Sequence, residues 1–174
     1  MKTVIKNARV FDGEKIFEAQ DVLFSDGRIC DKLDRSDAEA KIIDGAGCTL
    51  LPGLIDSHIH LNSIDNLSDA IKYGVTTMLD MGTGSDELIN DLRNQRGLTD
   101  IKSCHQPVVS EAGELLLKAM KTSMAEHMRQ NYVSNISDVK THVDMQIKKG
   151  EDYIKVILGE PPLIEERNVS RDFM

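Results

Sequence analysis

The stretch Leu51-Pro52-Gly53-Leu54-Ile55-Asp56-Ser57-His58-Ile59-His60-Leu61 decides how the rest of this chain is interpreted. A Pro-Gly pair breaks the chain at its start, and the apolar run that follows is typical of a buried strand. Because side chains alternate across a strand, one face is predicted to be largely apolar. The opposite face is predicted to carry Leu54, Asp56, His58 and His60.

Two histidines that stand two positions apart on one strand are candidate metal ligands. Burying a polar group costs free energy unless a partner satisfies it, and one divalent ion satisfies two imidazoles at once. Zinc and similar ions accept imidazole nitrogen as a ligand. A pair of hydrogen-bonded core histidines is the alternative. Because Asp56 lies two residues before His58, the pattern favours a divalent metal held by His58 and His60.

The composition bounds the class of protein. The 174 residues suffice for one domain, or for a small domain and part of another. A net charge of −8 argues against a nucleic-acid partner, and no basic run suggests a membrane surface. No segment approaches the ~20 apolar residues of a spanning helix. The cysteines Cys30, Cys48 and Cys104 show no paired spacing, so we expect reduced thiols and a cytoplasmic protein.

Two regions with different patterns divide the chain. Residues 1–52 predict an all-β subdomain of short strands, with turns at Asp12-Gly13 and Asp26-Gly27. Residues 53–174 alternate strand and helix, which predicts an α/β fold with a parallel sheet and right-handed crossovers. The strands are expected near 54–61, 75–81, 101–108 and 153–158, and helices near 63–72, 85–97 and, as a broken pair, 111–149.

Lys155 lies within the apolar run Tyr153-Ile154-Lys155-Val156-Ile157-Leu158. Burial favours the neutral amine of a lysine, which can act as a nucleophile or take up carbon dioxide to become a carbamate. Alternatively, Lys155 extends past the strand end or pairs with an acid such as Glu160. The ends of parallel strands converge on one rim, so the histidine strand earlier in the same sheet favours a functional lysine.

The chain resembles the amidohydrolase superfamily, and in particular its imidazolonepropionase and Xaa-Pro dipeptidase branch. The matching motifs occur in the family order between residues 7 and 156. They are Asn7-Ala8-Arg9-Val10-Phe11-Asp12-Gly13, Asp26-Gly27-Arg28-Ile29, Ile43-Asp44-Gly45-Ala46-Gly47, the Pro-Gly-Leu-Ile-Asp-Ser-His-Ile-His run, Gly74-Val75-Thr76-Thr77 and Asp152-Tyr153-Ile154-Lys155-Val156.

The resemblance implies a (β/α)8 TIM-type barrel, of which residues 53–174 form the first four strand–helix units, preceded by a small β-sandwich at 1–52. It implies that His58 and His60 bind a divalent metal, usually zinc, in a site of one or two ions. A carboxylated Lys155 would bridge the metals as a catalytic group, and Asp56 would orient an imidazole. Relatives hydrolyse C–N bonds of amides, cyclic amides or dipeptides with a hydroxide that the metal activates.

The resemblance covers only the N-terminal half of such a barrel. Relatives take further histidines from strands five and six, and an aspartate that acts as general base from strand eight. We therefore expect the isolated chain to be inactive. His105 is interpreted as a buried structural residue, and His127 and His142 as surface residues. An open half-barrel leaves sheet edges unpaired, so a homo-oligomer or association with a missing C-terminal half is expected.

Two other functions remain open from the sequence. The chain could be a non-catalytic scaffold or assembly module of the same fold, although a costly buried lysine argues against this. It could also hold a single metal with only the residues present, because two imidazoles and one carbamate can bind one zinc with an open position. If the chain is part of an enzyme, its substrate is expected to be a small amide or peptide-like molecule.

Overall fold

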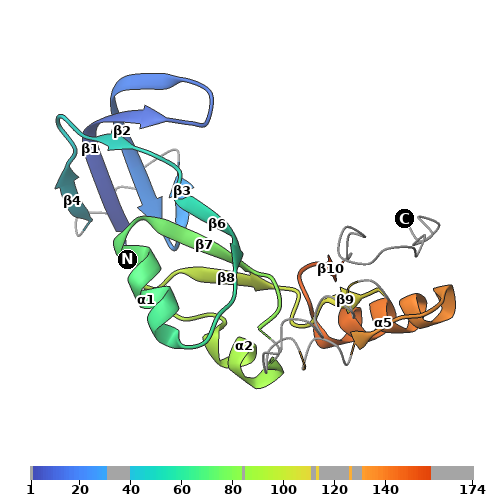
Figure 1. Cartoon of the computed structure of the whole chain (residues 1–174). Coiled ribbons are helices and arrows are strands. Elements are labelled where there is room, and N and C mark those ends of the chain that lie inside the picture. The colour runs from blue at the N-terminus through green and yellow to red at the C-terminus, as the bar shows by residue number, and fades with distance from the viewer. Residues whose placement is uncertain are drawn as a thin grey trace. The chain divides into compact units, whose positions relative to one another are not determined.

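The computed structural model describes residues 2–30, 40–83, 85–110, 113, 126 and 131–157 (Figure 1). Its contacts divide the chain into two units, Met1–Gly53 and Leu54–Met174. Within the described ranges, no helix combines the length and the apolar character that crossing a membrane requires.

The first unit contains one mixed sheet with the strand order β3-β2-β1-β4, and β5 also pairs with β1 (Figure 1). Strands β2 and β3 extend it in antiparallel fashion, whereas β4 and β5 both run parallel to β1. The strands are β1 (Lys2–Phe11), β2 (Ile16–Ser25), β3 (Arg28–Cys30), β4 (Lys41–Asp44) and β5 (Thr49–Leu50).

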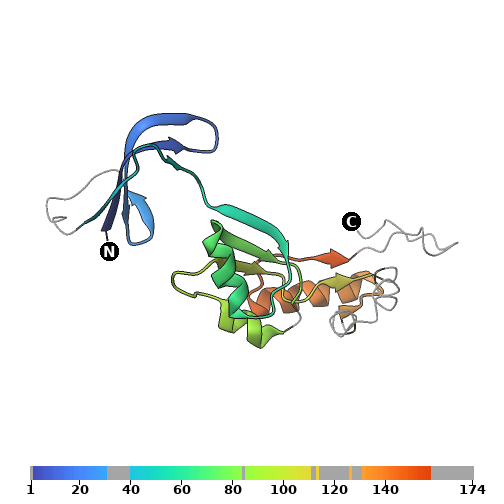
Figure 2. The same ribbon diagram turned by 60° about the vertical axis from the view of Figure 1, so that its left-hand side comes forward.

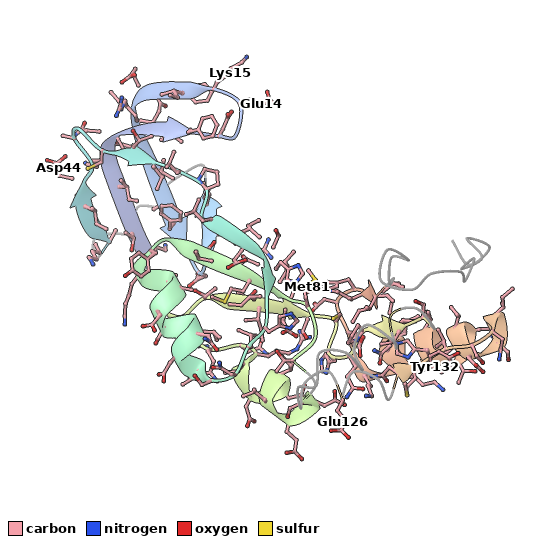
Figure 3. All side chains as sticks on the ribbon, in the orientation of Figure 1. Glu14, Lys15, Asp44, Met81, Glu126 and Tyr132 are labelled. Carbon is pink, nitrogen blue, oxygen red and sulfur yellow. The ribbon has the colours of Figure 1, made fainter. Side chains whose placement is uncertain are left out.

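Local turn chemistry sets the register of this sheet. Asp26 and Gly27, with φ of 50° and 77°, form the two-residue connection from β2 to β3, as their sequence predicts. Between β1 and β2, the Asp12 carboxylate accepts the backbone N–H groups of Glu14 and Lys15 at 2.9 and 2.8 Å. Glu14 and Lys15 are labelled in Figure 3 at this turn. Strand β2 begins at Ile16, and its exposed first half carries no burial pattern from which this start could be predicted.

The described residues of the first unit form a single layer, whereas a sandwich has two packed sheets. Val4, Ala8 and Leu23 are the buried hydrophobic residues of this layer. Large apolar side chains nevertheless remain exposed on its strands, namely Ile16, Phe17, Ile29, Ile42 and Ile43. The expected β-sandwich is thus represented here by one sheet, since no second layer occurs among the described residues.

The second unit begins with a parallel three-stranded sheet in the order β6-β7-β8. Helices α1 and α2 connect its strands and cover one face of it (Figures 1 and 2). The elements are β6 (Leu54–Ile59), α1 (Ile64–Lys72), β7 (Val75–Asp80), α2 (Asp86–Leu92) and β8 (Asp100–Ser103). The core between sheet and helices consists of Leu61, Leu67, Met78, Ile89, Leu92 and Ile101.

Capping residues start both helices. Ser63 and Asn66 form a capping box at the start of α1, and the Ser85 hydroxyl accepts the N–H of Leu88 at the start of α2. Helix α2 ends before the predicted Gly97, because Arg93 is extended and Asn94 has a left-handed φ of 59°.

A second parallel pair follows, formed by β9 (Val108–Val109) and β10 (Val156–Ile157) with α5 (Ile136–Lys149) between them in sequence. Asn135 caps the start of α5, and Gly150 ends it in the left-handed conformation. The predicted strand 101–108 is divided into β8 and β9, because His105 between them has φ of 48°. The other helix expected within 111–149 falls on residues outside the described ranges.

The described structure is therefore mixed α/β with parallel strands in two small sheets. The hydrogen bond from the Asp152 N–H to the Ser103 carbonyl, at 3.0 Å, connects the segment before β10 to the end of β8. A continuous four-stranded barrel wall does not occur among the described residues, so the expected half-barrel is represented only in part.

The packing of α1 gives a direct stability test. Leu67 is completely buried against β7 and α2, so Leu67→Ala is expected to lower the free energy of unfolding by about 2–5 kcal/mol. Ile64→Ala on the same helix, where the side chain is 46% exposed, should cost much less. Urea unfolding followed by circular dichroism measures both, and equal losses would show that α1 does not pack as described.

Candidate metal centre

The two predicted histidine ligands lie together at the end of β6. The ring centroids of His58 and His60 are 5.6 Å apart, and the ring planes meet at 68°. His58 is exposed and His60 is half-buried. Zinc–nitrogen bonds are about 2.0–2.1 Å long, so two imidazoles that share one ion must stand side by side in this way.

One nitrogen of His60 already has a partner that determines its protonation. Nδ1 lies 3.1 Å from the carbonyl oxygen of Gly82. A carbonyl oxygen can only accept, so Nδ1 is the donor in this contact, and in the neutral tautomer that this contact selects the lone pair lies on Nε2. Histidine ligands of metals commonly have their second nitrogen held in this manner. The donor chemistry of His60 therefore fits a divalent metal.

Strand β6 departs from the simple alternation expected of it. Its register against β7 shifts between Asp56 and Ile59, and Leu54 and Ile55 are 59% and 65% exposed. These two side chains are exposed because β6 is the outer strand of the described sheet and pairs only with β7. The Asp56 carboxylate accepts a hydrogen bond from the backbone N–H of His58 at 3.1 Å.

Lys155 directly precedes β10 and is half-buried. Its backbone carbonyl accepts the N–H of Val108 at 2.7 Å. The flanking Ile154 and Val156 are 40% and 51% exposed, so this strand is less buried than its apolar sequence predicts. Burial, together with the charges of Asp80 and Glu151, raises the pKa of the neighbouring Cys104 thiol to about 12, and the positive charge of Lys155 partly opposes this.

The sequence pattern does not single out Asp80, the last residue of β7, whose side chain is fully buried. One carboxylate oxygen accepts the hydroxyl of Thr83 and, at 3.4 Å, the N–H of Leu61. The other accepts the Ser103 hydroxyl at 2.6 Å and the Thr83 N–H at 3.3 Å. The sequence signal was an acid at the end of a β-branched strand with a threonine three residues later, whereas Leu61 and Ser103 come from other segments.

Tyr153 connects the lysine segment to the same region. Its hydroxyl lies 2.6 Å from the Asp80 carbonyl oxygen and 3.2 Å from that of Lys102. Burial raises the pKa of this phenol, so the hydroxyl stays protonated and donates. The residue two positions before Lys155 is thereby tied to the ends of β7 and β8.

A group of ion pairs lies between α2, α5 and the segment before Lys155. Arg93 contacts Asp152 at 2.8 Å, and Lys149 contacts Asp86 at 2.9 Å. Nδ1 of the buried His105 lies 3.0 Å from Asp86, which fits the structural role expected of this histidine. Although burial opposes it, hydrogen bonds from Lys149 and His105 hold the pKa of Asp86 below its usual value.

The surface position expected for His142 is wrong. His142 is 5% exposed, and burial lowers the pKa of its imidazole. Gln146, one helical turn later, is also buried and donates to the Gln106 carbonyl at 2.7 Å. The inner face of α5 thus packs polar side chains, which a hydrophobic pattern cannot reveal. His127 lies outside the described residues.

His58 and His60 do not form a complete metal site by themselves. In the described part of the chain, no three His, Cys, Asp or Glu side chains converge on a common point. A tetrahedral zinc site needs three or four protein ligands. The two imidazoles therefore fit a metal as part of a larger set of ligands.

Comparison with known proteins relates this chain to enzymes. No family model matches the chain. Over 99 residues, 47% of the chain, it is 33% identical to an enamidase of Eubacterium barkeri, and this region covers 26% of the enamidase. Over 63 residues, 35% of the chain, it is 49% identical to a dihydroorotase of Syntrophotalea carbinolica, of which it covers 15%.

A solved structure shows the same fold over most of the chain. A prolidase complexed with N-methylphosphonate-L-proline matches 90% of this chain with a TM-score of 0.70 and 21% sequence identity. The match covers 46% of the prolidase chain. The chain thus spans less than half the length of this solved relative and about a quarter or less of the two curated relatives.

The half-buried Glu151, whose carboxylate oxygens are shielded from water, predicts a pH-dependent stability. Burial raises the pKa of this carboxyl to about 8, whereas an unfolded glutamate titrates near ~4.3. The unfolded chain thus loses the proton first, so stability is fully present below the unfolded pKa and falls as pH rises toward and through 8. Urea unfolding at pH 5 and pH 8 should show this decrease in the wild type. Glu151→Gln should reduce it, and Glu87→Gln, at an exposed position of α2, should leave it unchanged.

Proposed function

Because this chain belongs to the amidohydrolase superfamily, we propose that it is the N-terminal part of a metal-dependent hydrolase of C–N bonds. The substrates would be small amides, cyclic amides or dipeptides. The observation that carries this proposal is the adjacent pair of His58 and His60, with Nδ1 of His60 held by the Gly82 carbonyl. In this proposal β6, β7, β8 together with β9, and β10 correspond to the strands of the first four strand–helix units of a (β/α)8 barrel.

His58, His60 and Lys155 would hold the metal, which we propose to be one or two zinc ions. A divalent metal in such a site polarises the substrate carbonyl and lowers the pKa of water from 15.7 to about 7. Lys155 as a neutral amine can add carbon dioxide with loss of a proton, and the resulting carbamate provides anionic oxygen ligands. The carbamate would supply a further metal ligand beside the two histidines.

The other residues of the chain prepare this site without taking part in the reaction. The Gly82 carbonyl fixes the tautomer of His60, and the Asp56 carboxylate accepts the backbone N–H of His58 at the irregular part of β6. Tyr153 holds the segment that carries Lys155 against the ends of β7 and β8. The chain thereby supplies oriented ligands, while a general base would come from elsewhere.

We propose that the site is completed by association, either with a C-terminal half or with a second copy of the chain. The support is the outer edge of β6, which has no paired strand among the described residues and exposes Leu54 and Ile55. Unpaired sheet edges favour association with another strand.

Zinc binding tests the ligand assignment. The full chain is expected to retain zinc after gel filtration, and His58→Ala, His60→Ala and Lys155→Ala should each lower the affinity by at least ~10–100-fold, the range typical of losing even an outer partner of a ligand. Chelator competition and elemental analysis measure this. Lys148→Ala, at an exposed position of α5, is the matched control for the lysine. Unchanged affinity in all three variants would exclude the metal assignment and favour the non-catalytic scaffold.

The carbamate makes a separate prediction. Zinc affinity of the wild-type chain should rise when bicarbonate is added to buffer freed of carbon dioxide, because the carbamate forms from the Lys155 amine. Lys155→Arg should show no such response. With ¹³C-labelled bicarbonate, a carbamate carbon resonance should appear in the wild type only. Equal zinc affinity with and without bicarbonate would remove Lys155 from the set of ligands.

A further inference from the structure

We propose that Asp80, acting through Thr83, is a positioning residue that fixes the metal-binding tautomer of His60. This inference rests on the proposed function and extends it to two residues whose side chains touch neither substrate nor metal. It starts from the observation that Asp80 is fully buried and has donors on both of its carboxylate oxygens.

The Thr83 hydroxyl connects Asp80 to the histidine strand. It donates to the Asp80 carboxylate, so its lone pairs are available, and it accepts the N–H of Leu61 at 2.8 Å. The Leu61 N–H can only donate, so the Thr83 oxygen accepts this bond and the hydroxyl hydrogen of Thr83 is left for the Asp80 carboxylate. A buried carboxylate with several donors holds them at short distances, and bonds to a charged acceptor are the stronger ones.

Two neighbouring contacts then join the same pair of segments. Leu61 follows His60 directly, and Thr83 follows Gly82 directly. The Leu61 N–H to Thr83 bond and the His60 Nδ1 to Gly82 carbonyl bond therefore lie one residue apart on both segments. Fixing Thr83 at Asp80 fixes the position of the Gly82 carbonyl, and this carbonyl selects the tautomer of His60.

The Gly82–Thr83 turn requires an external anchor. Gly82 has φ of 116°, a conformation open to glycine and rarely to other residues, and glycine loses the most conformational freedom when it is ordered. The Asp80 carboxylate provides the anchor by accepting both the hydroxyl and the N–H of Thr83, and Ser103 of β8 holds the carboxylate in turn. Without this anchor, the bond from the Met81 N–H to the Ile59 carbonyl, at 2.8 Å, would still hold the start of the turn, but the Gly82 carbonyl would lose its support on the Thr83 side.

The tautomer of His60 can be measured in the chain without metal. Imidazole ¹⁵N shifts, recorded at a pH where histidines are neutral, should show the Nδ1–H form in the wild type. Thr83→Val keeps the shape of the side chain and removes the hydroxyl, so His60 should shift toward the Nε2–H form that free histidine prefers. Thr83→Ser restores the hydroxyl and should restore the wild-type spectrum. Thr76→Val, at an exposed position of β7, makes the same substitution and should change nothing.

Zinc affinity provides the second measurement. Thr83→Val and Asp80→Asn are expected to weaken zinc binding by about 10–100-fold, as loss of an outer hydrogen-bond partner of a ligand does. Thr83→Ser and Thr76→Val should bind zinc like the wild type. Circular dichroism at the assay temperature identifies any variant that does not fold, and Asp80→Asn, which keeps the side-chain volume, replaces Thr83→Val if that variant is unfolded.

The outcomes separate the two proposals. A folded Thr83→Val or Asp80→Asn variant that keeps the Nδ1–H form of His60 overturns the role of Asp80, whatever its zinc affinity. A tautomer shift in these variants, absent from Thr83→Ser, supports that role even if the wild-type chain binds no zinc. In that last case only the proposed hydrolase site fails.

Discussion

A carboxylate shielded from water must find its hydrogen-bond donors inside the protein, and Asp80 finds them on three segments, two of which are distant in sequence. They are Leu61 after β6, Thr83 after β7 and Ser103 at the end of β8. The main-chain carbonyl of the same residue accepts the hydroxyl of Tyr153, which precedes β10. One residue thus ties the carboxyl ends of the strands to one another, at the place where the candidate ligands lie.

This arrangement matters because a metal site needs precise positions for its ligands. Supporting hydrogen bonds normally provide that precision. Here His60 is held through Gly82 and Thr83, and the segment that bears Lys155 is held through Tyr153 and Asp152. Both sets of contacts start from the ends of β7 and β8. The ligands therefore depend on the integrity of the sheet ends more than on their own strands.

Features that depend on neighbouring residues could be predicted from the sequence. The apolar helical pattern near 63–72 predicted α1, with Ser63 or Asp65 as its cap, and Asp26-Gly27 predicted the turn from β2 to β3. The spacing of His58 and His60 was enough to predict that they lie together.

Features that depend on tertiary contacts could not be predicted in this way. The left-handed φ of His105 divides the expected third strand, and its imidazole is held by Asp86, 19 residues earlier in the chain. The buried face of α5 carries His142 and Gln146, polar residues whose burial depends on the segments packed against the helix. Two of the three residues that donate to Asp80, Leu61 and Ser103, are likewise remote, so the full set of contacts to this acid had no local pattern.

The outer strand of the second unit shows how sequence and surroundings can disagree. Leu54 and Ile55 have the apolar character of buried strand residues, yet both are more than half exposed in the described structure. Exposed apolar surface is unfavourable by roughly 25 cal/mol per Å² relative to burial. The strand also presents an edge without a hydrogen-bonded neighbour among the described residues. Both deficits are corrected by the same event, the pairing of another strand with β6, and that strand would lie next to His58 and His60. Under the proposed function, completing the sheet and completing the candidate metal site would therefore be one structural requirement.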